Sequence, residues 1–418
     1  MTSLLLALVI VQLREPQLAG KNAIDRREVI AHVQRNVLER HPDFVPAARW
    51  RNVAAMAGEA TPEELERLAA DADVVRVDPD TGGTGGAAQS MPLVGADIVH
   101  NLGYTGRNVV VAVLDSGVDL AHEDFSGRIA DQHCFCRNAD GSGCCPDGTT
   151  EQSGAGAAAD DHGHGTNVTG ILASGGAKSV AGMAPSATIV AVKVLDRNNA
   201  FASTTQVISA LDWLLSHHRE VRVVNMSLLT NALFGSYCDE TTAFTGAFAS
   251  AINALRFNGT AVFACSGNNA NAQMMGAPAC VTNAISVGAV YDASFGAFNG
   301  FGCSDATTTA DRITCFSNSN TTLDLLGPGA LITSSGRGNA LSTFAGTSQA
   351  TPHVAGAAAI LFSIRPTLTV DQVETLLKKT GKPIVDERNG VTAPRLDILD
   401  AVQELLRPVP PRRRAVTP

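Results

Sequence analysis

The stretch GTSQATPHVAG, Gly346–Gly356, raises the question on which the fold depends. A serine stands among small residues, a proline follows four positions later, and an alanine-rich apolar run comes next. Ser348 could cap a helix, because serine side chains often accept a hydrogen bond from the first free N–H groups. It could also be a nucleophile at the positive end of a helix dipole. The rest of the chain has to distinguish these interpretations.

Strand-like apolar segments alternate with helical segments from about Met91 onward. In chain order they are NVVVAVLDSG, HGTNVTGILAS, ATIVAVKVL, TTQVISALDWLLSHH, VRVVNMSL, FTGAFASAINALRFNG, TAVFACSGN and NAISVGAV. This alternation predicts an α/β fold, a doubly wound and mostly parallel sheet with helices on both faces. In such sheets functional groups gather at the carboxyl ends of the strands.

Four polar side chains follow apolar segments, each beside or near a glycine. They are Asp115 in VAVLDSGVD, His164 in HGTNVTG, Asn268 in SGNN, and Ser348. Each alone is better explained as a turn or helix-start residue. Together they match serine chemistry, which needs a histidine base, a carboxylate that orients this base, and donors for the oxyanion.

These four blocks, in the order Asp, His, Ser, resemble the signature blocks of subtilisin-like serine proteases, the subtilases. The resemblance covers nearly all of residues 91–405. The order excludes an α/β-hydrolase, in which the serine comes first within G-x-S-x-G. The resemblance implies that Ser348 is the nucleophile, His164 the general base and Asp115 its orienting carboxylate. Asn268 and the Ser348 N–H would form the oxyanion hole.

A second histidine and a proline lie close to these residues. His162 competes with His164 for the role of base, but no Gly-Thr follows it, so we assign it to the loop. A metal pair formed by these two histidines is the alternative, although no third ligand is evident. Ser348 is expected to begin a helix with Pro352 in its first turn, where a missing N–H costs little.

The resemblance also implies that the substrate lies as an added strand between two extended segments. The residues that match these walls are Ser227, Leu228, Leu229, Ser266 and Gly267. Gly276 falls near the floor of the primary pocket, and because glycine leaves room we predict a preference for large apolar side chains just before the cut. Leu229 stands where the family usually has glycine and is expected to narrow the mouth of the cleft.

Residues 1–79 indicate a small α+β unit. Strands are expected in LALVIVQL, WRNVAAMAG and VVRVDPD, and helices in RREVIAHVQRNVLERH and TPEELERLAADAD, the latter with Thr61 as N-cap and Pro62 at its first position. Residues 80–90 form a Gly-rich linker that a protease would cut easily. The unit resembles the ferredoxin-like, inhibitor-like propeptide of secreted subtilases. An unrelated docking domain is the alternative.

Nine cysteines favour an oxidising compartment. We expect up to four disulfides and a free, buried Cys265. A zinc site built from Cys134, Cys136, Cys144 and Cys145 is the alternative, but their spacing differs from the usual C-x₂-C.

Composition narrows the partners. The net charge of −9 does not suggest a nucleic-acid partner, and no apolar run approaches the roughly 20 residues of a membrane span. We expect a monomer, with residues 406–418 as a Pro/Arg-rich, solvated tail. MTSLLLALVIVQL is either a poorly formed signal peptide or a strand, so an export signal could also be missing from this sequence.

These observations predict a secreted serine endopeptidase, made as a self-processing zymogen with its own propeptide as inhibitor. It would act on proteins or peptides and need no cofactor for the chemistry. Asp124 matches a calcium-binding position of some subtilases, but SGGAKS lacks the expected Asn, so a structural calcium ion is only a candidate. A catalytically silent binding protein and a processing enzyme with a narrow target are the alternatives. Asp160 and Asp161 are too few to indicate basic targets.

Overall fold

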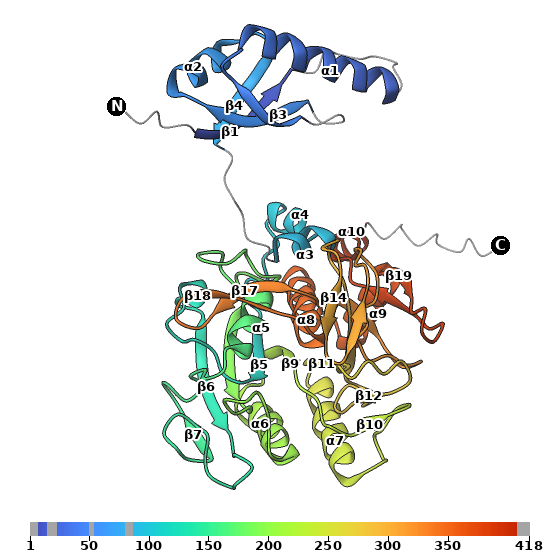
Figure 1. The fold of residues 1–418 in the computed structure, drawn as a ribbon. Coiled ribbons are helices and arrows are strands. Elements are labelled where there is room, and N and C mark those ends of the chain that lie inside the picture. Colours follow the sequence, from blue (N-terminus) through green and yellow to red (C-terminus); the bar gives the residue numbers. More distant parts are fainter. Residues whose placement is uncertain (1–6, 15–22, 50–53, 80–86, 408–418) are drawn as a thin grey trace, which may run out of the picture. The chain divides into compact units, whose positions relative to one another are not determined.

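The computed structural model describes residues 7–14, 23–49, 54–79 and 87–407. The chain divides into two units, Met1–Thr84 and Gly85–Pro418 (Figure 1). Most of the predicted linker, residues 80–86, lies outside the described residues, as do residues 1–6 and the tail from residue 408. The last linker residues, from Ala87, already belong to a helix.

The first unit has the order strand, helix, strand, strand, helix, strand. Its elements are β1 (Ala7–Leu13), α1 (Ala23–Arg40), β2 (Val45–Arg49), β3 (Ala55–Ala60), α2 (Pro62–Ala70) and β4 (Val74–Pro79). The sheet order β2-β3-β1-β4, with antiparallel pairing throughout, is the ferredoxin-like arrangement. Thr61 caps α2 by accepting a hydrogen bond from the Glu64 N–H, as predicted. Strand β2 was not anticipated.

The second unit is built on a ten-stranded sheet with the order β19-β20-β16-β13-β11-β9-β5-β8-β6-β7. Its strands are β5 (Val110–Asp115), β6 (Ile129–Phe135), β7 (Glu151–Ser153), β8 (Thr188–Lys193), β9 (Val221–Met226), β11 (Ala261–Cys265), β13 (Ile285–Val290), β16 (Leu325–Pro328), β19 (Lys382–Val385) and β20 (Thr392–Arg395). All neighbours from β20 to β6 pair in parallel, and only β19 and β7 add antiparallel edges. The predicted α/β fold is therefore confirmed.

Helices cover both faces of this sheet (Figure 1). They are α5 (His164–Ala173) and α8 (Thr347–Ile364) on one face, and α6 (Thr204–His217) and α7 (Ala243–Phe257) on the other. Strand β5 shows why both faces are apolar. Val111 and Val113 pack in the core under α5 and α8, whereas Ala112 and Leu114 pack in the core under α6 and α7. Since side chains alternate along a strand, a run of apolar residues fills both layers.

Shorter elements complete the unit. They are α3 (Ala87–Leu93), α4 (Ala96–Asn101), η1 (Glu123–Phe125), β10 (Leu233–Phe234), β12 (Met275–Gly276), β14 (Phe298–Gly300), β15 (Cys303–Asp305), β17 (Ile332–Gly336), β18 (Ala340–Phe344), α9 (Val370–Thr380) and α10 (Ile398–Leu406). None of the helices in the described ranges is both long and apolar enough to cross a bilayer.

Eight of the nine cysteines form disulfides. The pairs are Cys134–Cys145, Cys136–Cys144, Cys238–Cys280 and Cys303–Cys315. The ninth, Cys265, is free and buried, as predicted, and burial raises the pKa of its thiol to about 12. The four clustered cysteines are thus disulfide-bonded and do not form the alternative zinc site.

Candidate active site

Three neighbouring strands, β11, β9 and β5, bring the predicted site residues to one edge of the sheet. Asp115 is the last residue of β5, Ser227 follows β9 directly, and Asn268 lies three residues beyond β11. Because these strands are parallel, their carboxyl ends meet at the same edge. Residues that are far apart in sequence therefore share one site.

Asp115 and His164 form a buried hydrogen-bonded pair. His164 Nδ1 lies 2.7 Å from Asp115 Oδ1, and since a carboxylate can only accept, Nδ1 carries the proton. This leaves Nε2 as the basic nitrogen, which makes no hydrogen bond to any described residue. Burial lowers the pKa of His164, but the charge and hydrogen bond of Asp115, with a contribution from Asp160, outweigh it and leave the pKa raised. The pair has the geometry of a base with its orienting carboxylate.

The glycine that follows His164 allows this close approach. A Cβ atom at Gly165 would lie only 2.1 Å from the carbonyl oxygen of Gly117, in the loop after β5. With any residue other than glycine at position 165, a side chain would prevent the first turn of α5 from packing this closely against the loop after β5.

Asp160 organises the same region, and the sequence reasoning missed this role. Its Oδ1 accepts hydrogen bonds from Ser116 Oγ and from the His162 and Gly163 N–H groups, each at 2.9 Å. Its Oδ2 accepts from the Thr166 N–H at 3.0 Å and from Thr166 Oγ1 at 2.6 Å. The carboxylate thus ties the loop after Asp115 to the first turn of α5. An acidic residue shortly before a helix start was the available signal.

Ser348 is the second residue of α8 and is 7% exposed. Its Oγ donates to the Ser227 carbonyl oxygen at 3.2 Å, and no hydrogen bond to His164 is present. The two helix starts are nevertheless joined, because Gln349 Nε2 donates to Asn167 Oδ1 at 3.3 Å. Catalytic hydrogen bonds often tighten only once substrate is bound, so this geometry is compatible with a serine–histidine pair.

Pro352 lies in the second turn of α8, not in the first as expected. Its missing N–H removes the helical partner of the Ser348 carbonyl oxygen. That oxygen instead accepts a hydrogen bond from Ser227 Oγ at 2.8 Å. The proline therefore links the backbone of Ser348 to the segment that follows β9.

Asn268 is held with its amide nitrogen unbonded to any described residue. Its Oδ1 accepts hydrogen bonds from the Thr347 N–H at 2.8 Å and from Thr347 Oγ1 at 2.9 Å. Nδ2 is therefore available as a donor. Because Asn268 is bound to Thr347, this nitrogen is held near the next residue, Ser348, whose N–H in the first turn of α8 has no helical partner. Two such donors suit a developing oxyanion. Thr347, which the sequence reasoning did not single out, fixes the orientation of the amide.

A cleft of about 620 Å³ adjoins Ser348. Its lining includes Asn268 and the segment Ser227–Ala232, so Leu228 and Leu229 lie on its wall. Ser266, Gly267 and Gly276 are not part of the wall among the described residues. Leu229 occupies the room that Gly276 was expected to leave, because a Cβ atom on Gly276 would lie 2.7 Å from Leu229 Cδ1.

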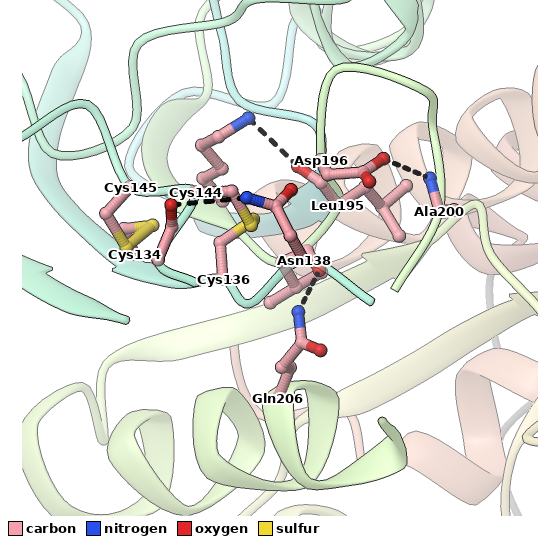
Figure 2. The surroundings of a disulfide bond; sticks show 12 residues. Cys134, Cys136, Asn138, Cys144, Cys145, Leu195, Asp196, Ala200 and Gln206 are labelled. Atoms are coloured by element: carbon pink, nitrogen blue, oxygen red, sulfur yellow. Dashed lines mark hydrogen bonds between the residues drawn. A yellow bond between two sulfur atoms is a disulfide. The ribbon is translucent and has the colours of Figure 1, made fainter. Parts of the chain in front are cut away.

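The disulfides Cys134–Cys145 and Cys136–Cys144 lie near the segment that contains Leu195, Asp196 and Ala200 (Figure 2). Strand β6 pairs with β8 at Cys134 and Lys193, which sets the disulfide-bonded loop beside the segment that begins at Leu195. That segment lines the cleft and is held by Asp196, which accepts from the Ala200 N–H at 3.0 Å (Figure 2). The disulfide loop thus supports the cleft wall without lining the cleft.

The surroundings of Asp124 do not fit a calcium ion. Its Oδ1 accepts from the Lys178 N–H at 2.7 Å, and its Oδ2 accepts from the Ser179 N–H, Ser179 Oγ and Ser335 Oγ at 3.1, 2.8 and 2.6 Å. Burial raises the pKa of Asp124, but these hydrogen bonds outweigh it and lower the pKa. Calcium needs six to eight oxygen ligands, whereas donors surround this carboxylate. In the described part of the chain, no group of three His, Cys, Asp or Glu side chains could hold a metal ion.

Comparison with known proteins gives one consistent family. A profile of the subtilase family matches residues 106–394. The extracellular serine proteinase of Thermus sp. (strain Rt41A) is 34% identical, over 85% of this chain and 76% of its own length. Subtilisin E of Bacillus subtilis (strain 168) is 30% identical, over 87% of each chain. A crystal structure of a cold-adapted subtilisin-like serine proteinase superposes with a TM-score of 0.52 at 28% identity, covering 70% of this chain and 89% of the other.

Proposed function

The chain belongs to the subtilase family and is a serine endopeptidase, and from this premise we propose that Asp115, His164 and Ser348 are its catalytic triad. The observation that carries the proposal is the buried hydrogen bond between His164 Nδ1 and Asp115 Oδ1. It selects the tautomer in which Nε2 can take a proton, and α5 and α8 bring this nitrogen and Ser348 to the same edge of the sheet.

The proposed reaction follows from these positions. His164 Nε2 accepts the Ser348 Oγ proton as Oγ attacks the peptide carbonyl carbon, and Asp115 stabilises the resulting imidazolium. The oxyanion accepts hydrogen bonds from Asn268 Nδ2 and the Ser348 N–H. His164 then gives the proton to the leaving amine, which departs and leaves an acyl-enzyme. A water molecule, activated by His164, hydrolyses the acyl-enzyme and restores Ser348.

The first unit is proposed to be a propeptide that the enzyme removes from itself. Supporting observations are its separate ferredoxin-like topology and the Gly-rich segment that connects it to the second unit. Secretion is proposed from the four disulfides, which persist in oxidising compartments, and from the extracellular relative. We further propose that the mature enzyme is a monomer.

The test compares the purified wild-type chain with Ser348→Ala by protein hydrolysis and intact mass. Wild type is expected to digest an unfolded protein substrate and to lose about its first 80–90 residues, since a linker rich in glycine is easily cut. The variant should do neither. If the variant digests protein as fast as wild type, Ser348 is not the nucleophile. If wild type digests protein but keeps its full mass, the propeptide proposal fails while the triad stands.

A further inference from the structure

Leu229 occupies the space between two glycines beside the cleft. Its Cδ1 lies 2.7 Å from the position that a Cβ atom would take on Gly267, and also 2.7 Å from that position on Gly276. Both glycines therefore face the same methyl group. The room that two absent side chains create is filled by one leucine.

Backbone hydrogen bonds hold the three segments around this leucine. The Thr230 N–H donates to the Ala277 carbonyl oxygen at 2.8 Å, and the Gly276 N–H donates to the Ser266 carbonyl oxygen at 3.1 Å. One neighbour of Leu229, Thr230, and one neighbour of each glycine, Ser266 and Ala277, are thus held in place. Leu229 is half-buried, so its side chain lies partly in this frame and partly at the cleft.

The side chain just before the cleaved bond must enter this region. Ser348 attacks the carbonyl of that residue, and the carbonyl oxygen lies at Asn268, the neighbour of Gly267. The Cα atom of that residue is bonded to the attacked carbon. Its side chain therefore begins close to Asn268, next to Gly267 and Leu229. Leu229 forms the cleft wall at this point, and the two glycines lie behind it.

Building on the proposed triad, we propose that Leu229 restricts cleavage to bonds that follow a small side chain, such as Gly, Ala or Ser. A large apolar side chain would have to displace the leucine from its contacts with both glycines. A pocket filled by a protein side chain discriminates between substrates by size. The larger substrate side chain clashes with the filling residue and cannot form its apolar contacts in the pocket. This specificity is the opposite of the one expected from Gly276 alone.

The test uses four chromogenic peptides that differ only in the residue before the cleaved bond: Gly, Ala, Leu or Phe. Wild type is expected to favour Ala over Phe by at least about 10–100-fold in kcat/KM, the discrimination that a single methylene group can produce in an apolar pocket. Leu229→Ala should raise kcat/KM for Phe and Leu and reverse this order. Leu102→Ala, at an exposed leucine that caps α4, is the matched control and should keep the wild-type ratio.

Two results would overturn the proposal. Wild type could cleave after Phe at least as well as after Ala, or a folded Leu229→Ala could keep the wild-type ratio. If Leu229→Ala does not fold, Leu229→Val opens the pocket by a smaller amount and replaces it. The Ala-to-Phe ratio of kcat/KM in wild type still tests the proposal. Hydrolysis of the peptides by Ser348→Ala would instead contradict the triad, so the two failures are distinguishable.

Discussion

Two buried aspartate–histidine pairs in the second unit, the proposed catalytic pair and a structural one, are hydrogen-bonded in opposite ways. In one, His164 Nδ1 donates to Asp115, and Asp115 Oδ2 is a buried acceptor that no described residue contacts by a hydrogen bond. In the other, His122 Nδ1 accepts from the Asp124 N–H at 3.2 Å, and its Nε2 lies 3.0 Å from the Ala340 carbonyl oxygen. His122 therefore carries its proton on Nε2, whereas His164 keeps Nε2 free for chemistry.

The carboxylates of Asp115 and Asp124 also differ in how many of their oxygens accept hydrogen bonds. Both are almost fully buried, yet every oxygen of Asp124 is occupied by donors from Lys178, Ser179 and Ser335. Asp115 spends one oxygen on His164 and on the Ser116 N–H. Burial and proximity thus do not separate a reactive pair from a structural one. The two pairs are separated instead by whether the histidine Nε2 atom is left free to act on a substrate, as it is in His164 and not in His122.

The largest expected effect is on the proposed catalytic pair, Asp115 and His164. Asp115→Asn should lower kcat about 10⁴-fold, a size borrowed from other serine proteases, subtilisin among them, because the His164 tautomer is no longer fixed. The substitution should hardly change the thermal midpoint. Peptide hydrolysis at saturating substrate measures the loss. A variant within tenfold of wild type would show that Asp115 does not orient the base.

Next in size is the effect on the proposed oxyanion donor, Asn268. Asn268→Ala should lower kcat about 10²–10³-fold with little change in KM, a magnitude measured in subtilisin itself. The amide acts mainly on the transition state, so the loss should fall on kcat. Steady-state kinetics on the same peptide separate the two parameters. An effect confined to KM would assign Asn268 to ground-state binding instead.

The structural pair should respond in stability alone. Asp124→Asn should keep kcat within about twofold and lower the free energy of unfolding by about 2–3 kcal/mol, because charge-assisted hydrogen bonds are lost in a buried site. Urea unfolding in a Ser348→Ala background avoids self-digestion, and Asp140→Asn in the exposed disulfide loop is the control. The loss should be the same with and without a chelator. A loss that disappears on chelation would instead indicate a cation at Asp124.

The smallest effect concerns pH. His164 must be neutral to accept a proton, so kcat/KM should rise with pH through its pKa, which lies above the ordinary 6.5. The negative charge of Asp160 contributes to the raised pKa of His164. Asp160→Asn should therefore lower this pKa and move the ascending limb of the kcat/KM profile to lower pH. Asp97→Asn, which removes an exposed carboxylate of α4, should leave the limb unchanged. An unchanged limb in Asp160→Asn would reduce Asp160 to a purely structural tie.

The sequence predicted what depends on local pattern. The apolar runs that end in Asp115, Ser227 and the SGN of Asn268 indicated buried parallel strands, and the carboxyl ends of such strands were expected to carry the functional groups. Thr61 and Pro62 located the start of α2 through capping chemistry. These features are properties of a few consecutive residues, so no distant contact was needed to read them.

Other features depend on contacts between distant residues. Asp160 acts on Ser116, 44 residues away, and Leu229 fills a space bounded by Gly267 and Gly276. Neither contact follows from spacing. Strand β2 was missed because VPAAR contains a proline and has no fully buried residue, so it lacks the apolar signal of a strand. The disulfide partners likewise required the fold.

The most direct test of the difference between the two pairs is the rate at which a fluorophosphonate labels the protein, followed by peptide-mapping mass spectrometry. The account predicts one adduct, on Ser348, that forms at similar rates in wild type and Asp124→Asn and far more slowly in Asp115→Asn. An adduct on another residue, or equal labelling rates in all three proteins, would contradict the assignment of Asp115 and His164 as the pair that activates Ser348.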